Sequence, residues 1–301
     1  TRRSSDLAKL VEGLYHTMDP TQLHVIINTG DDDIFYGLHV SPDIDTMIYT
    51  LANKVNRKKG WGLRKETFLT LRHLERFYGR AWFGLGDKDL ATHIFRTEML
   101  KEGHSLTKTT QILAQKFGIK AHLYPMSNSS IKTIVETKNG ELAFQEYFVK
   151  YRHEPKVIGV KYQGREKVQL DSLIIKLLHD ADKIIICPSN PWLSIAPILK
   201  IQPIEQLFSQ LRSKIYAISP IINGQALKGP TRKIMDSFGL SPTCVEIAKF
   251  YHKIAGHFII DPSDQALKPE IETHDISCKI FPIILHDRNS KKKLAQYLLD
   301  L

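Results

Sequence analysis

Five aspartates crowd the stretch from residue 31 to residue 45, directly after Asn28-Thr29-Gly30. Carboxylates this close repel one another unless a cation balances their charge, and hard oxygen ligands suit Mg2+. Helix capping in a polar turn explains Asp33 and Asp43 when they are taken alone, but it does not explain the whole cluster. We therefore predict a magnesium site whose ligands are Asp31, Asp32 and Asp45.

The segment directly before the aspartates is predicted to be the strand that positions them. Residues 23–27 form a continuous apolar run of mostly β-branched type, which is typical of a parallel strand buried on both faces. The polar residues Asn28, Thr29 and Gly30 then lie at its carboxyl end, where open α/β sheets bind their ligands. We expect these three residues to take part in binding.

The second half of the chain alternates strand and helix patterns, which implies right-handed crossovers and a parallel sheet. The predicted fold class is α/β, with a Rossmann-like parallel sheet and helices on both faces. We predict strands at 183–187, 215–219, 257–260 and 279–285, and helices at 171–179, 204–211, 231–238 and 244–253.

Polar loops shaped by glycine and proline follow these strands. Turns need such residues in any case, but the coincidence of several polar loops at one sheet edge favours a binding site. The candidate binding residues in these loops are Ser189, Asn190, Pro191, Ser194, Ser219 and Asn223.

Residues 46–160 lack the strand–helix alternation of the second half. They separate the two parts of the predicted Rossmann-like core, residues 1–45 and 161–301. Asn139-Gly140 is a strong hairpin signal, so we interpret the segment as a mixed helical and antiparallel insertion. A helix at 65–78 is expected to turn Phe68, Leu71 and Leu74 inward. The other predicted elements are a helix at 7–15, helices at 45–51, from Leu90 to near Gly103 and at 105–118, and strands at 121–126, 132–137 and 141–149.

The composition is that of a soluble globular protein, with 42% hydrophobic and 25% charged residues. No apolar run reaches the length of a membrane span, and the first residues lack the layout of a signal peptide. We therefore expect a cytoplasmic protein without a membrane partner. The three cysteines show no metal-ligand spacing and are expected to be reduced thiols.

The net charge of +10 raises the question of nucleic acid. The basic residues are scattered apart from the runs 57–59 and 291–293, and no nucleic-acid-binding motif accompanies them. We expect both runs to be solvated faces and expect no nucleic-acid partner. The excess positive charge favours anionic small substrates, especially phosphorylated ones.

Seven short motifs lie in order along the chain. They are Asn-Thr-Gly-Asp-Asp (28–32), Ser-Pro-Asp-Ile-Asp-Thr (41–46), Gly-Trp-Gly (60–62), Leu-Gly-Asp-Lys-Asp-Leu-Ala-Thr-His (85–93), Pro-Met-Ser (125–127), Cys-Pro-Ser-Asn-Pro (187–191) and Ser-Pro-Ile-Ile (219–222). From about Ala8 onward, this set resembles the 2-phospho-L-lactate transferase family, whose members build the deazaflavin coenzyme F-420.

The resemblance implies a transferase reaction. The ribityl hydroxyl of 7,8-didemethyl-8-hydroxy-5-deazariboflavin attacks a guanosine-diphosphate-linked phospholactate, phosphoenolpyruvate or similar three-carbon acid. A phosphodiester forms and GMP leaves, with magnesium assisting, so positioning and charge stabilisation carry the catalysis. The resemblance also implies a homodimer.

The resemblance further implies site residues. Asp45 and Lys88 are implied contacts of the deazaflavin, with the insertion forming that side of the site, and the loop 189–191 resembles the guanine-nucleotide side. We expect Asp45 to lie in a polar site rather than in the core. We expect His93 to support the site from behind or to be structural, rather than to act as a general base. The implied catalytic residues are Asp45, Asp32 and Lys88.

Two departures from the family stand out. Lys88 replaces an arginine, which keeps the charge but loses the planar fork. Family members also open with a strand that runs into a Gly-Gly-Thr-Gly-Gly-type loop, whereas residues 1–7 lack those glycines. Such a loop lets backbone N–H groups approach a diphosphate, so we expect part of the nucleotide site to be missing. A rival interpretation is a non-catalytic or regulatory nucleotide-binding protein on the same fold.

Overall fold

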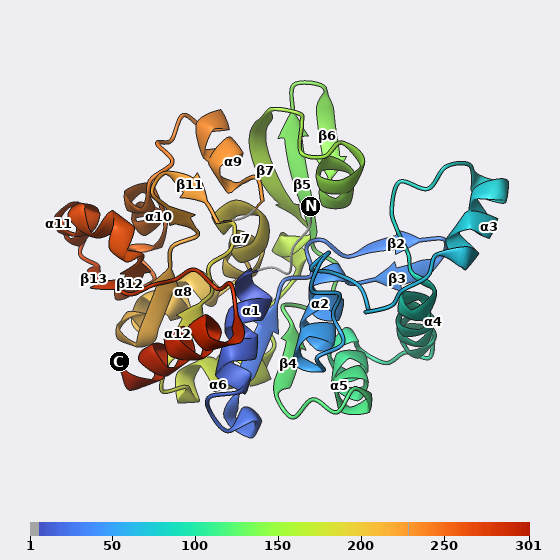
Figure 1. The fold of residues 1–301 in the computed structure, drawn as a ribbon, viewed down its shortest axis with the longest axis horizontal. Coiled ribbons are helices and arrows are strands. Elements are labelled where there is room, and N and C mark those ends of the chain that lie inside the picture. Colours follow the sequence, from blue (N-terminus) through green and yellow to red (C-terminus); the bar gives the residue numbers. More distant parts are fainter. Residues whose placement is uncertain (1–5, 228) are drawn as a thin grey trace.

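A four-stranded parallel sheet organises the second half of the chain. The structure is a computed structural model that describes residues 6–227 and 229–301 (Figure 1). The strand order is β8–β9–β12–β13, and all neighbours are parallel. The predicted strand at 279–285 is wrong beyond Ile280, because the neighbouring strand ends at Ile260, which accepts a last backbone hydrogen bond from Phe281. The strands are β8 (Ile184–Ile186), β9 (Ile215–Ile218), β12 (His257–Ile260) and β13 (Ser277–Ile280).

Both faces of this sheet are buried. Ile215 and Ala217 of β9 belong to one hydrophobic cluster, whereas Tyr216 and Ile218 belong to a second cluster. A strand covered on both faces needs apolar residues at successive positions, which is why these strands appear as continuous apolar runs in the sequence.

Helices pack on each face, and the predicted α/β class is confirmed. The first cluster contains residues of α6 (Ser172–Asp180), α8 (Ile204–Gln210), α10 (Cys244–Tyr251) and α11 (Lys268–Glu272). The second contains residues of α1 (Asp6–Tyr15), α2 (Pro42–Leu51), α5 (Leu106–Lys116) and α12 (Arg288–Asp300). The connections include α7 (Ala196–Leu199), α9 (Thr231–Ser237) and a hairpin of β10 (Ile221–Ile222) and β11 (Gln225–Ala226).

The strand that precedes the aspartates is β1 (His24–Ile27), as predicted, and it pairs in parallel with β4 (His122–Pro125). This pair forms a separate two-stranded sheet. Because β4 falls within residues 46–160, that segment supplies a parallel strand as well as helices and a hairpin. The division of the chain into core and insertion stays a prediction.

The predicted hairpin at Asn139-Gly140 is confirmed. It joins β5 (Lys132–Thr137) to β6 (Gly140–Ala143), and β7 (Val157–Gln163) adds a third antiparallel strand. The predicted strand at 141–149 is wrong after Ala143, because the chain turns there into the π-helical turn η2 (Glu146–Lys150). A second hairpin, which the sequence did not predict, consists of β2 (Asp33–Phe35) and β3 (Leu38–Val40).

Helix α3 (Leu69–Tyr78) stands at one end of the molecule in Figure 1, beside α4 (Asp87–Lys101). The residues predicted to face inward, Phe68, Leu71 and Leu74, are half-buried, whereas most other positions of the helix are exposed. Phe77 and Tyr78 are 82% and 70% exposed.

The C-terminal helix α12 packs against α1 through a buried carboxylate. The Glu12 Oε2 atom accepts a 2.5 Å hydrogen bond from Lys291 Nζ, and its Oε1 atom accepts one of 2.7 Å from Arg57. These bonds lower the pKa of Glu12 even though burial alone would raise it. Gly13 permits the close contact, because a Cβ there would lie 2.5 Å from the carbonyl oxygen of Lys291. The expectation that residues 291–293 form a solvated face is therefore wrong for Lys291.

Every helix in the described part of the chain is too short or too polar to cross a membrane. The expected loss of a glycine-rich loop concerns the first residues, of which 1–5 lie outside the described residues.

Candidate active site

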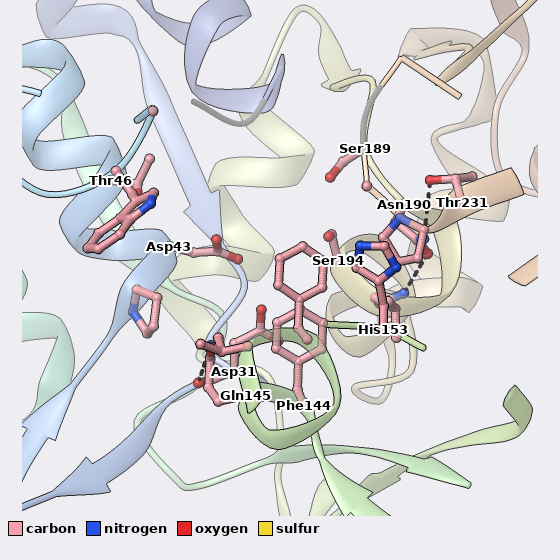
Figure 2. A pocket seen from close by; sticks show the side chains of 18 of the residues that line it. Asp31, Asp43, Thr46, Phe144, Gln145, His153, Ser189, Asn190, Ser194 and Thr231 are labelled. Carbon is pink, nitrogen blue, oxygen red and sulfur yellow. Dashed lines mark hydrogen bonds between the residues drawn. The ribbon is translucent and has the colours of Figure 1, made fainter. Parts of the chain in front are cut away.

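A cavity of about 790 Å³ opens where the loops after β1, β8 and β9 meet the start of α2 and the turn η2. Its size lies in the range of small-molecule sites, and its position beyond the carboxyl ends of parallel strands is the one predicted for ligand binding. Figure 2 shows the polar side chains around it. Those that line the cavity are Asp31, Asp43, Thr46, Gln145, Arg152, His153, Ser189, Asn190, Ser194 and Thr231.

Asn28 joins two carboxylates at this cavity. Its Nδ2 atom donates to Asp31 Oδ1 and to Asp43 Oδ2, each at 3.2 Å, while its Oδ1 atom accepts from the backbone N–H of Gly30 at 2.8 Å. A Cβ at Gly30 would lie 2.4 Å from Thr133 Oγ1, so any side chain there would displace Thr133. The buried residues Asn28, Thr29 and Gly30 thus form the support of Asp31.

Asp45 lies beneath the cavity rather than in its wall. Its side chain pairs with both terminal nitrogens of Arg96, one at 3.2 Å from Oδ2, and Arg96 has no solvent exposure. The Nδ1 atom of His93 is 3.6 Å from Asp45 Oδ2, and burial lowers the pKa of His93 to about 4. The expectation that Asp45 avoids the core is therefore wrong, since it is only 5% exposed.

Asp32 is also behind the cavity wall. Its Oδ2 atom accepts a 2.6 Å hydrogen bond from Ser41 Oγ, and its Oδ1 atom has no hydrogen-bond partner among the described residues. Burial raises the pKa of Asp32 well above its usual range.

A further buried carboxyl group, Asp89 on the first turn of α4, was not singled out by the sequence. Burial, followed by the nearby charge of Asp45, raises the pKa of Asp89 to about 7. Within the described ranges, its Oδ1 atom has no hydrogen-bond partner.

The residues of this cavity fit a magnesium ion that is bound jointly by the protein and a substrate phosphate. They do not fit an ion that is bound by protein ligands alone. Among residues 6–227 and 229–301, no three His, Cys, Asp or Glu side chains converge on a common point. Mg2+ usually takes one or two carboxylates and completes its shell with water and substrate phosphates. Asp31 and Asp43, bracketed by Asn28, supply two carboxylates at the cavity.

The loop after β8 forms the other side of the cavity. Asn190 Oδ1 accepts from the N–H groups of Trp192 and Leu193 at 3.0 and 2.9 Å, which caps the turn η4 (Pro191–Ile195). Its Nδ2 atom donates to Thr231 Oγ1 at 3.2 Å. The amide of Asn190 therefore joins two loops, and it leaves Ser189 and Ser194 at the cavity (Figure 2).

Other predicted residues lie away from this cavity. Ser219 is fully buried and bonds within its own turn, to the backbone of Ile221. The backbone N–H of Asn223 donates to Asp264 at 3.0 Å. Pro191 is buried at the start of η4. The ammonium of Lys88 donates to the carbonyl of Arg64 at 3.2 Å and lines a separate hollow.

Sequence reasoning missed Thr231 and the wall residues of η2. The signal for Thr231 was its place after Gly229-Pro230, at the start of a predicted helix. Residues 144–149 gave no comparable signal, because they belonged to the predicted strand at 141–149, and Arg152 and His153 lay in no predicted element. Arg96 was missed because a single arginine in a helix is usually solvated.

Two crystal structures of one Bacillus halodurans protein share the fold. One, of the UPF0052 family, aligns over 99% of each chain with a TM-score of 0.60 and 14% identity. The other aligns over 99% of this chain and all of its own, with a TM-score of 0.62 and 13% identity.

Similarity to characterised relatives extends along almost the whole chain. A 2-phospho-L-lactate transferase of Methanococcoides burtonii is 35% identical over 97% of this chain and 95% of its own. One from Methanosarcina acetivorans is 32% identical with the same coverage. A phosphoenolpyruvate transferase of Streptomyces griseus is 32% identical over 98% of this chain and 94% of its own. The family described as 2-phospho-L-lactate transferase CofD matches residues 5–291. The chain therefore belongs to the 2-phospho-L-lactate transferase family, a family of transferase enzymes.

Proposed function

We propose that this chain transfers a phospholactate-type or phosphoenolpyruvate-type group from a guanosine-diphosphate-linked donor to the ribityl hydroxyl of 7,8-didemethyl-8-hydroxy-5-deazariboflavin, with release of GMP. The observation that carries the proposal is the cavity in which Asn28 holds Asp31 and Asp43 on one side and the Ser189–Ser194 loop lies on the other (Figure 2). The relatives include both 2-phospho-L-lactate and phosphoenolpyruvate transferases, which supports both three-carbon acids.

In this reaction the hydroxyl oxygen forms a bond to the phosphorus that carries the acid. The phosphoanhydride bond to GMP breaks, the bridging oxygen leaves with GMP, and the hydroxyl proton passes to solvent or to a basic group of the site. Little covalent chemistry falls to the protein, so positioning and charge stabilisation supply the rate enhancement.

Asp31 and Asp43 would hold a magnesium ion, which would neutralise charge on the diphosphate. Asn28 keeps the two carboxylates in place from behind. The hydroxyls of Ser189 and Ser194, which line the opposite side, would donate hydrogen bonds to the nucleotide.

The remaining predicted contacts have different roles in this proposal. Asp45, paired with Arg96, fixes α2 and thereby Asp43, so it acts as a positioning residue. Asp32 supports the same turn through Ser41. The contact of Lys88 with the deazaflavin stays a prediction from the resemblance, as does the homodimer.

The test is GMP release, measured by chromatography, from the guanylylated acid with and without deazaflavin and Mg2+. Release that requires both supports the transferase. Binding of GDP without turnover would favour the rival, a regulatory nucleotide-binding protein. Mass spectrometry of the product with each candidate acid identifies the group that is transferred.

A matched pair of variants tests the acidic site. Asp43→Asn should abolish magnesium-dependent turnover. Asp33→Asn is the control, because Asp33 does not line the cavity and its Oδ1 atom pairs with Lys132 Nζ at 3.2 Å. This variant should keep full activity. Equal activity of the two variants would place the magnesium elsewhere.

A further inference from the structure

We propose that Phe144 and Phe148 form the wall against which the planar heteroaromatic ring of a substrate stacks. This inference rests on the proposed function and adds a ring-binding subsite to it. Both phenylalanines line the cavity. Their rings are nearly parallel, with centroids 5.3 Å apart and planes inclined by 14°, and the ring of His153 lies 5.6 Å from that of Phe148.

The backbone explains why both rings reach the same wall. The two residues are four positions apart where β6 runs into η2, a spacing that places side chains on one face of a helical turn. Tyr147, between them, is fully buried and packs with Val135 and Val157. The aromatic wall is therefore fixed to the three-stranded sheet.

A hydrogen bond joins this wall to the acidic side of the cavity. Gln145 Nε2 donates to the carbonyl oxygen of Asp31 at 3.2 Å. In Figure 2 the ring of Phe144 lies between Asp31 on one side and Ser194 and His153 on the other. A ligand that extended from the carboxylates to these groups would therefore run past Phe144.

Two rings in the proposed reaction have the required chemistry, the guanine of the donor and the deazaflavin of the acceptor. Stacking on an aromatic side chain needs only a π-face, so the wall suits either ring. It does not recognise a diphosphate, which has no ring. This difference allows the ring subsite to be tested separately from the phosphate site.

Titration calorimetry should use three probes, namely GDP, the deazaflavin and ring-free inorganic pyrophosphate. Phe144→Leu and Phe148→Leu keep an apolar side chain but remove the ring. We expect at least one ring-bearing probe to bind about tenfold more weakly to these variants, about 1.4 kcal/mol. Pyrophosphate binding should stay unchanged, which also shows that the variants fold.

Phe238→Leu is the matched control. Phe238 packs on the same small hydrophobic cluster, next to Trp192, but does not belong to the cavity lining. This variant should bind all three probes as the unmodified chain does. Phe144→Tyr, which restores the ring, should recover the affinity lost in Phe144→Leu.

The pattern of losses decides the source of the ring. A loss of affinity for GDP alone assigns the wall to the guanine ring, and a loss of affinity for the deazaflavin alone assigns it to the acceptor ring. Either outcome supports the inference. Unchanged affinity for both ring-bearing probes, or an equal loss for all three probes, overturns it. If the phenylalanine variants lost affinity in this way but the unmodified chain showed no turnover, the proposed function would fail while the ring subsite stood.

Discussion

Arg96 and Asp45 form an ion pair from which water is almost completely excluded. Arg96 has no solvent exposure and Asp45 is 5% exposed. The pair joins α4 to α2 directly beneath the carboxylates of the cavity. Because each charge has lost its hydration, each depends on the other.

Asp45→Asn should therefore destabilise the fold as well as reduce activity. The substitution leaves the charge of Arg96 buried and uncompensated, which costs about 3–5 kcal/mol. The free energy of unfolding in urea measures the effect. Asp43→Asn, on the same turn but at the cavity, should cost far less. A stability of Asp45→Asn equal to that of the unmodified chain would contradict the ion pair.

Asp89 gives the protein a distinct pH dependence. Its pKa of about 7 in the folded state exceeds the usual value of 3.8, so the folded state binds the proton more tightly than the unfolded chain. The resulting stabilisation is complete below about pH 4 and is lost as the pH rises to about 7, by roughly 4 kcal/mol. Asp89→Asn, which cannot ionise, should not show this loss.

The effect of Asp89 is measured as the difference in unfolding free energy between the unmodified chain and Asp89→Asn. His39 and His93 have pKa values lowered to about 4 by burial, so their contribution falls as the pH decreases from 6.5 to 4, in the opposite sense. Both proteins contain these histidines, so the histidine contributions cancel when the unfolding free energy of one is subtracted from that of the other at pH 4.5 and at pH 7.5. Parallel pH profiles would refute the raised pKa of Asp89.

Asn28→Leu should weaken the use of magnesium. The substitution removes two hydrogen bonds to carboxylates, each worth about 1.5–3 kcal/mol, and leaves Asp31 and Asp43 without their common support. We expect roughly a tenfold higher Mg2+ concentration for half-maximal turnover. Asn56→Ala removes an asparagine that likewise accepts backbone hydrogen bonds, from Lys58 and Lys59, and serves as the control.

Asn190→Ala should loosen the opposite side of the cavity. It removes the cap of η4 and the link to Thr231, and a lost cap costs about 0.5–2 kcal/mol. The KM for the guanylylated donor should rise in step with the loss of stability. Thr231→Val removes only the link between the loops and should have a smaller effect on the unfolding free energy. The reverse order would show that the cap matters less than the link.

The parallel strands and the position of the cavity follow from local sequence. The apolar run before Asn28 predicts both a strand and the edge at which Asp31 lies, because a strand buried on two faces needs no distant information to be recognised. Ser189 and Ser194 were found in the same way, as polar residues directly after a strand.

The residues that sequence reasoning missed depend on partners far along the chain. Arg96 and Lys291 look like surface residues until Asp45 and Glu12 are placed against them. Phe144 belongs to a run that alternates like a strand, and only the π-helical turn η2 brings it to the cavity. Local patterns do not contain these contacts.

The two cations that bond Glu12 come from opposite parts of the sequence. Lys291 belongs to the C-terminal helix, whereas Arg57 belongs to the segment that continues to Gly60 and Trp61 in the cavity wall. One carboxylate on α1 thus ties α12 to the segment that leads into the cavity wall, so the two ends of the sequence share a single anchor.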